Sequence, residues 1–203
     1  MIKNIIFDLG NVLISFQPKE YFTKIFLNEA RAVAMINCVF KHKYWSDLDK
    51  GILTEEEATE LFCQDAPHLE SDIRQGMRMW KDMLVPIPET VHILEELKEA
   101  GYQLFVLSNY PREAFERTSS GNDFFNLFDG TVISYTVGMT KPQKEIYEYL
   151  LQRYALTAQE TLFIDDLEEN IMGAEKLNIH TILFRSSNQL GTYIREYLKQ
   201  EIN

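Results

Sequence analysis

Five short apolar runs, separated by helical patterns, constrain the fold of this chain more than any other feature. They are residues 2–7, 104–108, 161–165 and 180–184, with a weaker one at 130–134. Each run is brief and ends at polar or turn-forming residues, which is typical of a buried strand.

Helical patterns occupy the intervals between the later runs. Their markers are Pro88 with Val91, Leu94, Leu97 and Gly101; Ile146, Leu150 and Tyr154 after Pro142; and Ile171, Ala174 and Leu177. Strands that alternate with helices predict a parallel sheet covered on both faces, which is an α/β fold.

Residues 16–85 break this alternation, because no convincing strand occurs among them. Tyr21, Phe22, Ile25 and Phe26 share one helical face, and Thr54 with Glu57 forms a capping box before another helical pattern. A chain of 203 residues allows one large domain, or one domain with a modest insert. We therefore expect a small all-helical unit inserted after the first strand.

Chemically capable side chains follow the predicted strands. Asp8 ends the first, Ser108 the second, and Asp165 and Asp166 the fourth, while Lys141 follows the third. The carboxyl ends of parallel strands meet at one sheet edge, where ligands bind. Clustered carboxylates need a cation, and hard oxygen ligands without His or Cys favour Mg²⁺. A lysine, a hydroxyl and turn amides could hold a phosphate while a carboxylate attacks it.

Composition narrows the class of partner. Thirty-one acidic and twenty basic residues give a net charge of −11, which disfavours binding to nucleic acid or anionic lipid. No apolar run is long enough to span a bilayer, and the first residues lack a signal-peptide layout. Cys38 and Cys63 lack metal-ligand spacing, so we expect reduced thiols and a cytoplasmic location.

Four ordered motifs resemble those of the haloacid dehalogenase-like hydrolase superfamily. They are Phe7–Leu13 (FDLGNVL), Leu107–Asn109 (LSN), Lys141–Pro142 (KP) and Ile164–Asn170 (IDDLEEN). The resemblance spans nearly the whole chain, and within the superfamily it is closest to bacterial phosphatases of the α-D-glucose-1-phosphate phosphatase type. It implies a doubly wound, Rossmann-like core of residues 1–15 and 86–203, with a helical cap of residues 16–85.

The resemblance also implies roles. Asp8 would be the nucleophile and form an aspartyl-phosphate, and Lys141 would brace both nucleophile and phosphate. Ser108 and the amide of Asn109 would hold the phosphoryl group. The predicted metal residues are Asp8, Gly10 through its carbonyl, Asp166, and Asp165 as a ligand or just behind the ligands; Asn170 would orient them. We expect a Mg²⁺-dependent phosphatase for a small phosphorylated metabolite, in particular a sugar phosphate.

Gly10 departs from the superfamily pattern. Most phosphatases of the superfamily carry an aspartate two residues after the nucleophile, as general acid and base, and glycine has no side chain to do this. Loss of general acid catalysis typically costs on the order of 10²–10⁴ in rate. A leaving group of low pKa, a water molecule or a cap residue could replace it.

Other interpretations stay open at this point. Asp8, Ser108 and Lys141 are each, taken singly, typical of a turn, a helix cap and a surface lysine. A metal-independent dehalogenase, a phosphomutase or a non-catalytic binding module could share the motifs.

In the predicted cap, residues 44, 45, 47 and 49 before Gly51 are candidate pocket residues, namely Tyr44, Trp45, Asp47 and Asp49. For Asp47 and Asp49 the pattern favours solvent exposure over a pocket position. For Trp45 a pocket position and a place in the cap core are equally well supported. No pattern specifies an oligomeric state.

Overall fold

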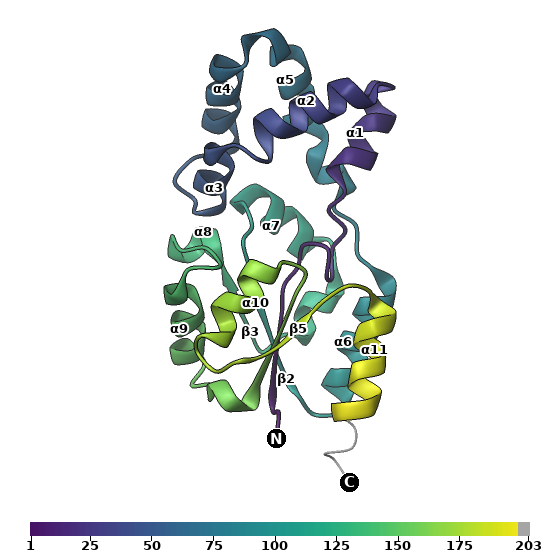
Figure 1. Ribbon diagram of the computed structural model, residues 1–203, viewed down its shortest axis with the longest axis vertical. Helices are drawn as coiled ribbons and strands as arrows, with labels where there is room; N and C mark the ends of the chain where they lie inside the picture. Colours follow the sequence, from purple (N-terminus) through teal and green to yellow (C-terminus); the bar gives the residue numbers. More distant parts are fainter. Residues whose placement is uncertain (199–203) are drawn as a thin grey trace.

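The computed structural model describes residues 1–198, and its core is a five-stranded parallel sheet (Figure 1). The strands are β1 (Asn4–Phe7), β2 (Gln103–Ser108), β3 (Gly130–Ile133), β4 (Thr161–Asp165) and β5 (His180–Leu183), in the order β3-β2-β1-β4-β5. The chain builds one side of β1 first and then crosses to β4 on the other side. The carboxyl ends of β1 and β4 therefore flank a topological switch point, where ligands bind in open sheets.

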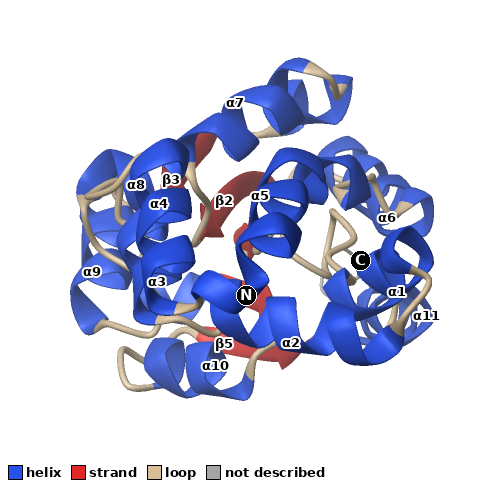
Figure 2. Ribbon diagram, turned by 90° about the horizontal axis from the view of Figure 1, so that it is seen from above, coloured by secondary structure: helices blue, strands red, loops and turns tan. Residues whose placement is uncertain are grey.

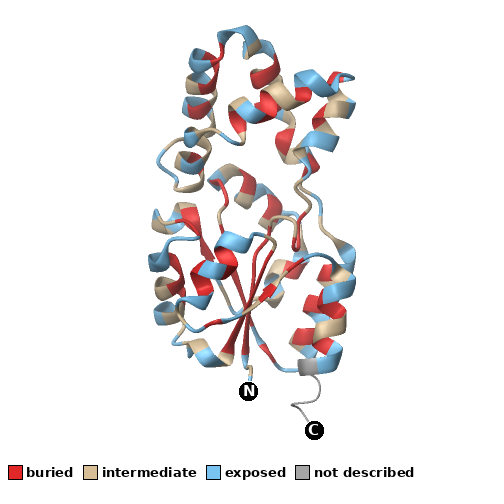
Figure 3. Cartoon of the chain, viewed as in Figure 1, coloured by how far each residue is buried: buried red, intermediate tan, exposed pale blue. Residues whose placement is uncertain are grey.

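Helices cover both faces of this sheet, as the alternating pattern predicts. Side chains alternate along β1, so Ile5 and Phe7 join one apolar cluster while Ile6 joins a second. The first cluster packs under α6 (Pro88–Glu99) and α11 (Ser187–Tyr193), and the second under α9 (Lys144–Arg153) and α10 (Glu168–Glu175). Buried residues accordingly run along the strands in Figure 3. The fold is a doubly wound α/β sheet.

Five further elements complete the sheet region. They are α7 (Arg112–Ser120), α8 (Ser134–Val137), the 3₁₀ turns η3 (Asp123–Leu127) and η4 (Ala158–Glu160), and a π-helical turn, η5 (Ile194–Leu198).

A layer of helices lies over the carboxyl ends of the strands. It contains α1 (Pro18–Phe26), α2 (Glu29–Val39), α3 (Lys43–Asp49), α4 (Glu55–Asp65), η1 (Pro67–Leu69), α5 (Glu70–Met79) and η2 (Trp80–Met83). Seen from above, these helices lie across the end of the sheet (Figure 2). The predicted capping box starts α4, since Thr54 Oγ1 accepts from the Glu57 amide and the Glu57 carboxylate accepts from the Thr54 amide.

Two chain segments connect the sheet to the helical layer and pair with each other. The Ser15 amide donates to the Val85 carbonyl at 2.8 Å, and the Ile87 amide donates to the Leu13 carbonyl at 2.8 Å. We propose this pair as the joint between a core of residues 1–15 and 86–203 and a cap of residues 16–85.

Three of the strands, β1, β3 and β5, are slightly shorter than the apolar runs predict, whereas β4 matches its run and β2 begins one residue earlier. The first begins at Asn4, where register with Gln103 and Thr161 starts, and the third ends at Ile133. Ser134 leaves the sheet because its hydroxyl accepts a hydrogen bond from the Tyr110 amide and α8 begins there. Cys38 and Cys63 are both free, and within residues 1–198 every helix is too short or too polar to span a membrane.

Candidate active site

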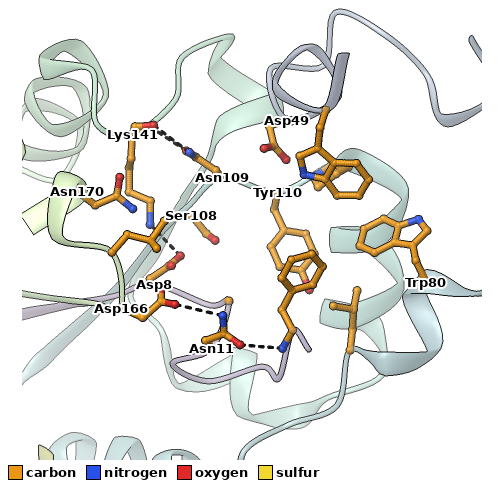
Figure 4. Close-up of a pocket in the computed structure, with 16 residues that line it drawn as sticks. Asp8, Asn11, Asp49, Trp80, Ser108, Asn109, Tyr110, Lys141, Asp166 and Asn170 are labelled. Carbon is orange, nitrogen blue, oxygen red and sulfur yellow. Dashed lines mark hydrogen bonds and ion pairs between the residues drawn. The ribbon is translucent and has the colours of Figure 1, made fainter. Parts of the chain in front are cut away.

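A cavity of about 380 Å³ lies between the strand ends and the helical layer (Figure 4). The side nearest the sheet, called here the sheet-edge wall, is formed by Asp8, Gly10, Asn11, Ser108, Asn109, Lys141, Asp166 and Asn170. The opposite side, called the helical wall, is formed by Phe16, Trp45, Asp49, Trp80 and Leu84. The structure thus brings the predicted chemical residues together at one cavity, with Asp165 directly behind it.

Lys141 is buried between two carboxylates. Its Nζ lies 2.8 Å from Asp8 Oδ1 and 2.6 Å from Asp165 Oδ2, and the residue is only 4% exposed. Burial alone lowers the pKa of a lysine, but the two carboxylates outweigh it and the pKa of Lys141 is raised. Lys141 is therefore a permanent positive charge beside Asp8.

Asp8 follows β1 and carries the least satisfied carboxylate of the group. Burial raises its pKa to about 6, opposed by Lys141 and reinforced by Asp165. Among the described residues, Asp8 Oδ1 has an ion-pair contact with Lys141 but no aligned hydrogen bond. A buried oxygen in this state is stabilised by a cation or by bond formation.

Asp165 differs from Asp8 because its hydrogen bonds are complete. Its Oδ1 accepts from the Leu167 amide at 2.8 Å and from Asn170 Nδ2 at 3.0 Å. Its Oδ2 accepts from Lys141 at 2.6 Å and from the same Asn170 amide at 3.0 Å. Asp165 is fully buried and absent from the cavity lining, so its geometry suits holding Lys141 and Asn170 in place.

Asp166 faces the cavity from the start of the loop before α10. Its Oδ2 accepts a hydrogen bond from Asn11 Nδ2 at 3.1 Å, and burial is the main cause of a raised pKa. One carboxylate oxygen each from Asp8, Asp165 and Asp166 lie within 4.8 Å of one another. Three carboxylates against one lysine leave an excess of negative charge.

These residues fit Mg²⁺. The donors are hard oxygens, the local charge is negative, and Asp8 Oδ1 is buried without a hydrogen bond. Asp8, Gly10 and Asp166 all line the cavity, so the two carboxylates and the Gly10 carbonyl are the groups that would hold the ion. Asp165 is predicted either as a metal ligand or as a residue behind the ligands. Its full set of hydrogen bonds and its absence from the cavity lining fit the position behind the ligands.

Ser108 and Asn109 complete the sheet-edge wall beside Asp8. Ser108 is the last residue of β2 and is buried. The Asn109 side chain accepts from the Lys141 amide at 2.8 Å and donates to the Lys141 carbonyl at 3.0 Å. This exchange ties two of the predicted motifs together and fixes the backbone from which Lys141 extends.

The helical wall is mainly aromatic. The ring centroids of Trp45 and Trp80 are 5.0 Å apart at a steep angle, and Trp45 also packs on Phe40 at 4.5 Å. Trp45 therefore belongs to the packed interior of the helical layer and lines the cavity as well. Tyr44 and Asp47 do not line the cavity.

Asp49 differs from the expected solvent-exposed acid. It is half-buried, lines the cavity, and has a pKa raised to about 8, mainly by burial. Sequence pattern could not place it, because its position depends on α3 ending against α8. There the Ser134 hydroxyl donates to the Asp49 carbonyl.

Asn11 is a site residue to which sequence reasoning assigned no role. Its backbone is left-handed (φ 53°), a conformation that asparagine tolerates better than most residues. Its Oδ1 accepts from the Phe16 amide at 3.1 Å and from Gln17 Nε2 at 3.0 Å, while its Nδ2 binds Asp166. The only signal in the sequence was a Gly-Asn pair directly after the strand.

A comparison with family models matches residues 2–178 to the haloacid dehalogenase-like hydrolases. The chain belongs to this family. It is 27% identical over 177 residues to a sesquiterpene phosphatase of Aspergillus oryzae, covering 87% of each chain. It is also 27% identical over 190 residues to a D-ribitol-5-phosphate phosphatase of Bacteroides thetaiotaomicron, covering 89% of this chain and 91% of the relative.

Solved structures agree with the assignment of this hydrolase. A haloacid dehalogenase family enzyme from Bacteroides thetaiotaomicron, in its magnesium complex, superposes with a TM-score of 0.75 at 25% identity, covering 96% of this chain and 99% of that one. The same enzyme has been solved with magnesium and inorganic phosphate. A (S)-2-haloacid dehalogenase of Burkholderia cepacia is 26% identical over 156 residues, covering 74% of this chain and 65% of the relative.

Proposed function

We propose that this hydrolase is a Mg²⁺-dependent phosphatase that cleaves a small phosphate monoester through an aspartyl-phosphate on Asp8. The observation that carries the proposal is the set of Asp8, Lys141 and Asp166 around one cavity, with Asp165 saturated by hydrogen bonds behind Lys141. The enzyme of Bacteroides thetaiotaomicron solved with magnesium and phosphate supports it.

Each residue of the site has a separate role in phosphoryl transfer. Asp8 attacks phosphorus, while Lys141 offsets the negative charge of both Asp8 and the phosphoryl oxygens. Ser108 and Asn109 hold those oxygens in line with the attack. Bound Mg²⁺ supplies further positive charge against the phosphate. Water then cleaves the aspartyl-phosphate and regenerates Asp8.

A metal-independent dehalogenase is the alternative, and one relative carries that name. In that reaction Asp8 attacks carbon, so no phosphate charge has to be neutralised. The cavity-facing Asp166 favours the phosphatase, because three clustered carboxylates against one lysine leave negative charge that a metal-free reaction does not use.

The leaving group is the finer part of the proposal. A sugar phosphate is supported by the D-ribitol-5-phosphate phosphatase relative, and a sugar ring can lay its C–H face on the partly exposed Trp45, which lines the cavity. A second candidate, an isoprenoid phosphate, is favoured by the helical wall, where Asp49 is the single charged side chain among apolar ones. The sesquiterpene phosphatase relative supports this second candidate.

Hydrolysis of p-nitrophenyl phosphate with and without Mg²⁺ tests the proposed reaction. We expect EDTA to abolish turnover and added Mg²⁺ to restore it. Asp166→Asn should raise the Mg²⁺ concentration needed for half-maximal activity, whereas Asp47→Asn, outside the cavity, should not. Full turnover in EDTA, or halide release from 2-chloropropionate without metal, would support the dehalogenase instead.

A panel of substrates tests the leaving group. Ribitol 5-phosphate, glucose 1-phosphate, glucose 6-phosphate and farnesyl phosphate are compared by kcat/KM at saturating Mg²⁺. A preference of tenfold or more for farnesyl phosphate would select the isoprenoid candidate, and the reverse preference would select the sugar phosphate.

A further inference from the structure

Gly10 leaves an open space next to the nucleophile. A Cβ atom built on Gly10 would have no non-adjacent atom within 4 Å. A phosphatase still has to protonate a poor leaving group, because an alkoxide is a far stronger base than the aspartyl oxygen that displaces it. A proton donor must therefore come from elsewhere around the cavity.

Asp49 occupies the facing side of the same cavity. It is the last residue of α3, and its carboxyl group lies across the cavity from Asp8 (Figure 4). Among residues 1–198, the structure shows no hydrogen bond or ion pair to this carboxyl group. Trp45 and Trp80 line the same wall of the cavity. Asp49 thus presents an uncommitted carboxyl group to the reaction space.

The backbone of Asp49 is held firmly against the sheet domain. The Ser134 hydroxyl donates to the Asp49 carbonyl and accepts from the Tyr110 amide at 2.9 Å. Two residues later Gly51 has φ 70°, and a Cβ there would lie 2.9 Å from the Tyr135 carbonyl oxygen. The end of α3 therefore rests directly on α8, which fixes where the carboxyl group enters the cavity.

The charged groups facing Asp49 are Lys141 and Asp8. Burial raises the pKa of Asp49 to about 8; Lys141 opposes this, and the negative charge of Asp8 adds to it. At neutral pH the group is accordingly protonated, which is the state a general acid requires.

We propose that Asp49 is the general acid and base of this hydrolase, in a site where the Gly10 position has no side chain to do this. The inference deepens the proposed phosphatase function and rests on it. It names one residue of the helical wall as part of the chemistry, so the helical layer would both enclose the substrate and protonate it.

The reaction has two steps. Asp8 forms a bond to phosphorus as the phosphorus–oxygen bond to the leaving group breaks; the leaving oxygen keeps that electron pair and receives the Asp49 proton, giving a neutral alcohol. Asp49, now a carboxylate, then takes a proton from water as the water oxygen bonds to phosphorus. The bond from phosphorus to Asp8 breaks, its electron pair returns to Asp8, and phosphate leaves.

Asp49→Asn tests the proposal, with Asp47→Asn on the same helix as the matched control. We compare kcat/KM for glycerol phosphate, which has an alkoxide leaving group, with kcat/KM for 2,4-dinitrophenyl phosphate, which needs no proton. Asp49→Asn should lower kcat/KM for glycerol phosphate about 10²–10⁴-fold and kcat/KM for dinitrophenyl phosphate less than about tenfold. Asp47→Asn should change neither.

The second step supplies an independent readout. With dinitrophenyl phosphate, Asp49→Asn should release a burst of dinitrophenol equal to the enzyme concentration, because the aspartyl-phosphate then lacks its base. In the unaltered protein, kcat/KM for glycerol phosphate should fall above pH 8 as Asp49 ionises, while that for dinitrophenyl phosphate should not. This pH profile needs no variant and so does not depend on variant folding.

Two results would overturn the role of Asp49. The first is an equal decrease of kcat/KM for both substrates in Asp49→Asn, which indicates a structural role. The second is an unchanged kcat/KM for both substrates in that variant. A different result marks failure of the proposed function itself, namely that the unaltered protein with Mg²⁺ fails to hydrolyse dinitrophenyl phosphate.

Discussion

The sheet-edge wall carries charged and amide side chains held by hydrogen bonds, whereas the helical wall carries aromatic rings and one carboxyl group that has no partner among residues 1–198. The first is built from strand ends whose spacing is set by sheet register, and its members hold one another. The second is built from helix ends and loops. This difference indicates that the sheet edge acts on the phosphate, which all substrates share, and the helical wall on the leaving group, which varies.

The largest effect on kcat is expected when the nucleophile is removed from the sheet-edge wall. Asp8→Asn keeps the shape of the side chain but loses the attacking carboxylate, so kcat should fall at least about 10⁴-fold for every substrate. Steady-state assays on aryl and alkyl phosphates measure this, with circular dichroism to confirm folding. A loss confined to one class of leaving group would contradict the division between the walls.

Lys141→Met should affect both activity and stability. It leaves Asp8 and Asp165 buried without their shared counter-charge, which costs about 3–5 kcal/mol when a buried pair is broken. We expect a lower Tm, a partial recovery of Tm with Mg²⁺, and a kcat reduced for aryl and alkyl phosphates alike. Thermal melts with Mg²⁺ and with EDTA measure the recovery, and Lys144→Met, an exposed lysine, is the control.

Gly10→Asp in the Asp49→Asn background sharpens the comparison by moving the acid to the other wall. A Cβ atom at Gly10 would meet no non-adjacent atom within 4 Å. We expect kcat/KM for glycerol phosphate to recover about 10-fold or more relative to Asp49→Asn alone, with little change for dinitrophenyl phosphate. Gly10→Ala in the same background is the control and should recover nothing.

The smallest effect on activity is expected from a substitution in the aromatic part of the helical wall. Trp45→Leu removes a flat surface from the cavity while keeping an apolar residue in the packed layer. KM for the preferred substrate should rise about tenfold with kcat within about threefold, since uniform binding is lost and the chemistry is not. For inorganic phosphate, which has no leaving group, the inhibition constant should stay the same; a parallel rise would contradict the assignment.

Much of the sheet-edge wall could be predicted because its position follows from strand order. Buried apolar runs predict strands, parallel strands end at one edge, and so Asp8, Ser108 and Asp165 had to converge. Separating Asp165 from Asp166 by role required the hydrogen bonds, because adjacent residues on a strand end point in different directions. The role of Asn11 could not be predicted for a similar reason, since it depends on a left-handed turn that folds back onto Asp166.

The sequence by itself determined the α/β class, the helical insert and the chemistry gathered beside Asp8, because these depend on periodicity and on residue types at strand ends. Only the tertiary structure decided which acid of the helical layer reaches the cavity. Asp47 and Asp49 are the same residue type two positions apart, and local pattern cannot tell them apart. The contact of Ser134 with the end of α3 sets which one faces inward, and that contact joins residues 85 positions apart in the chain.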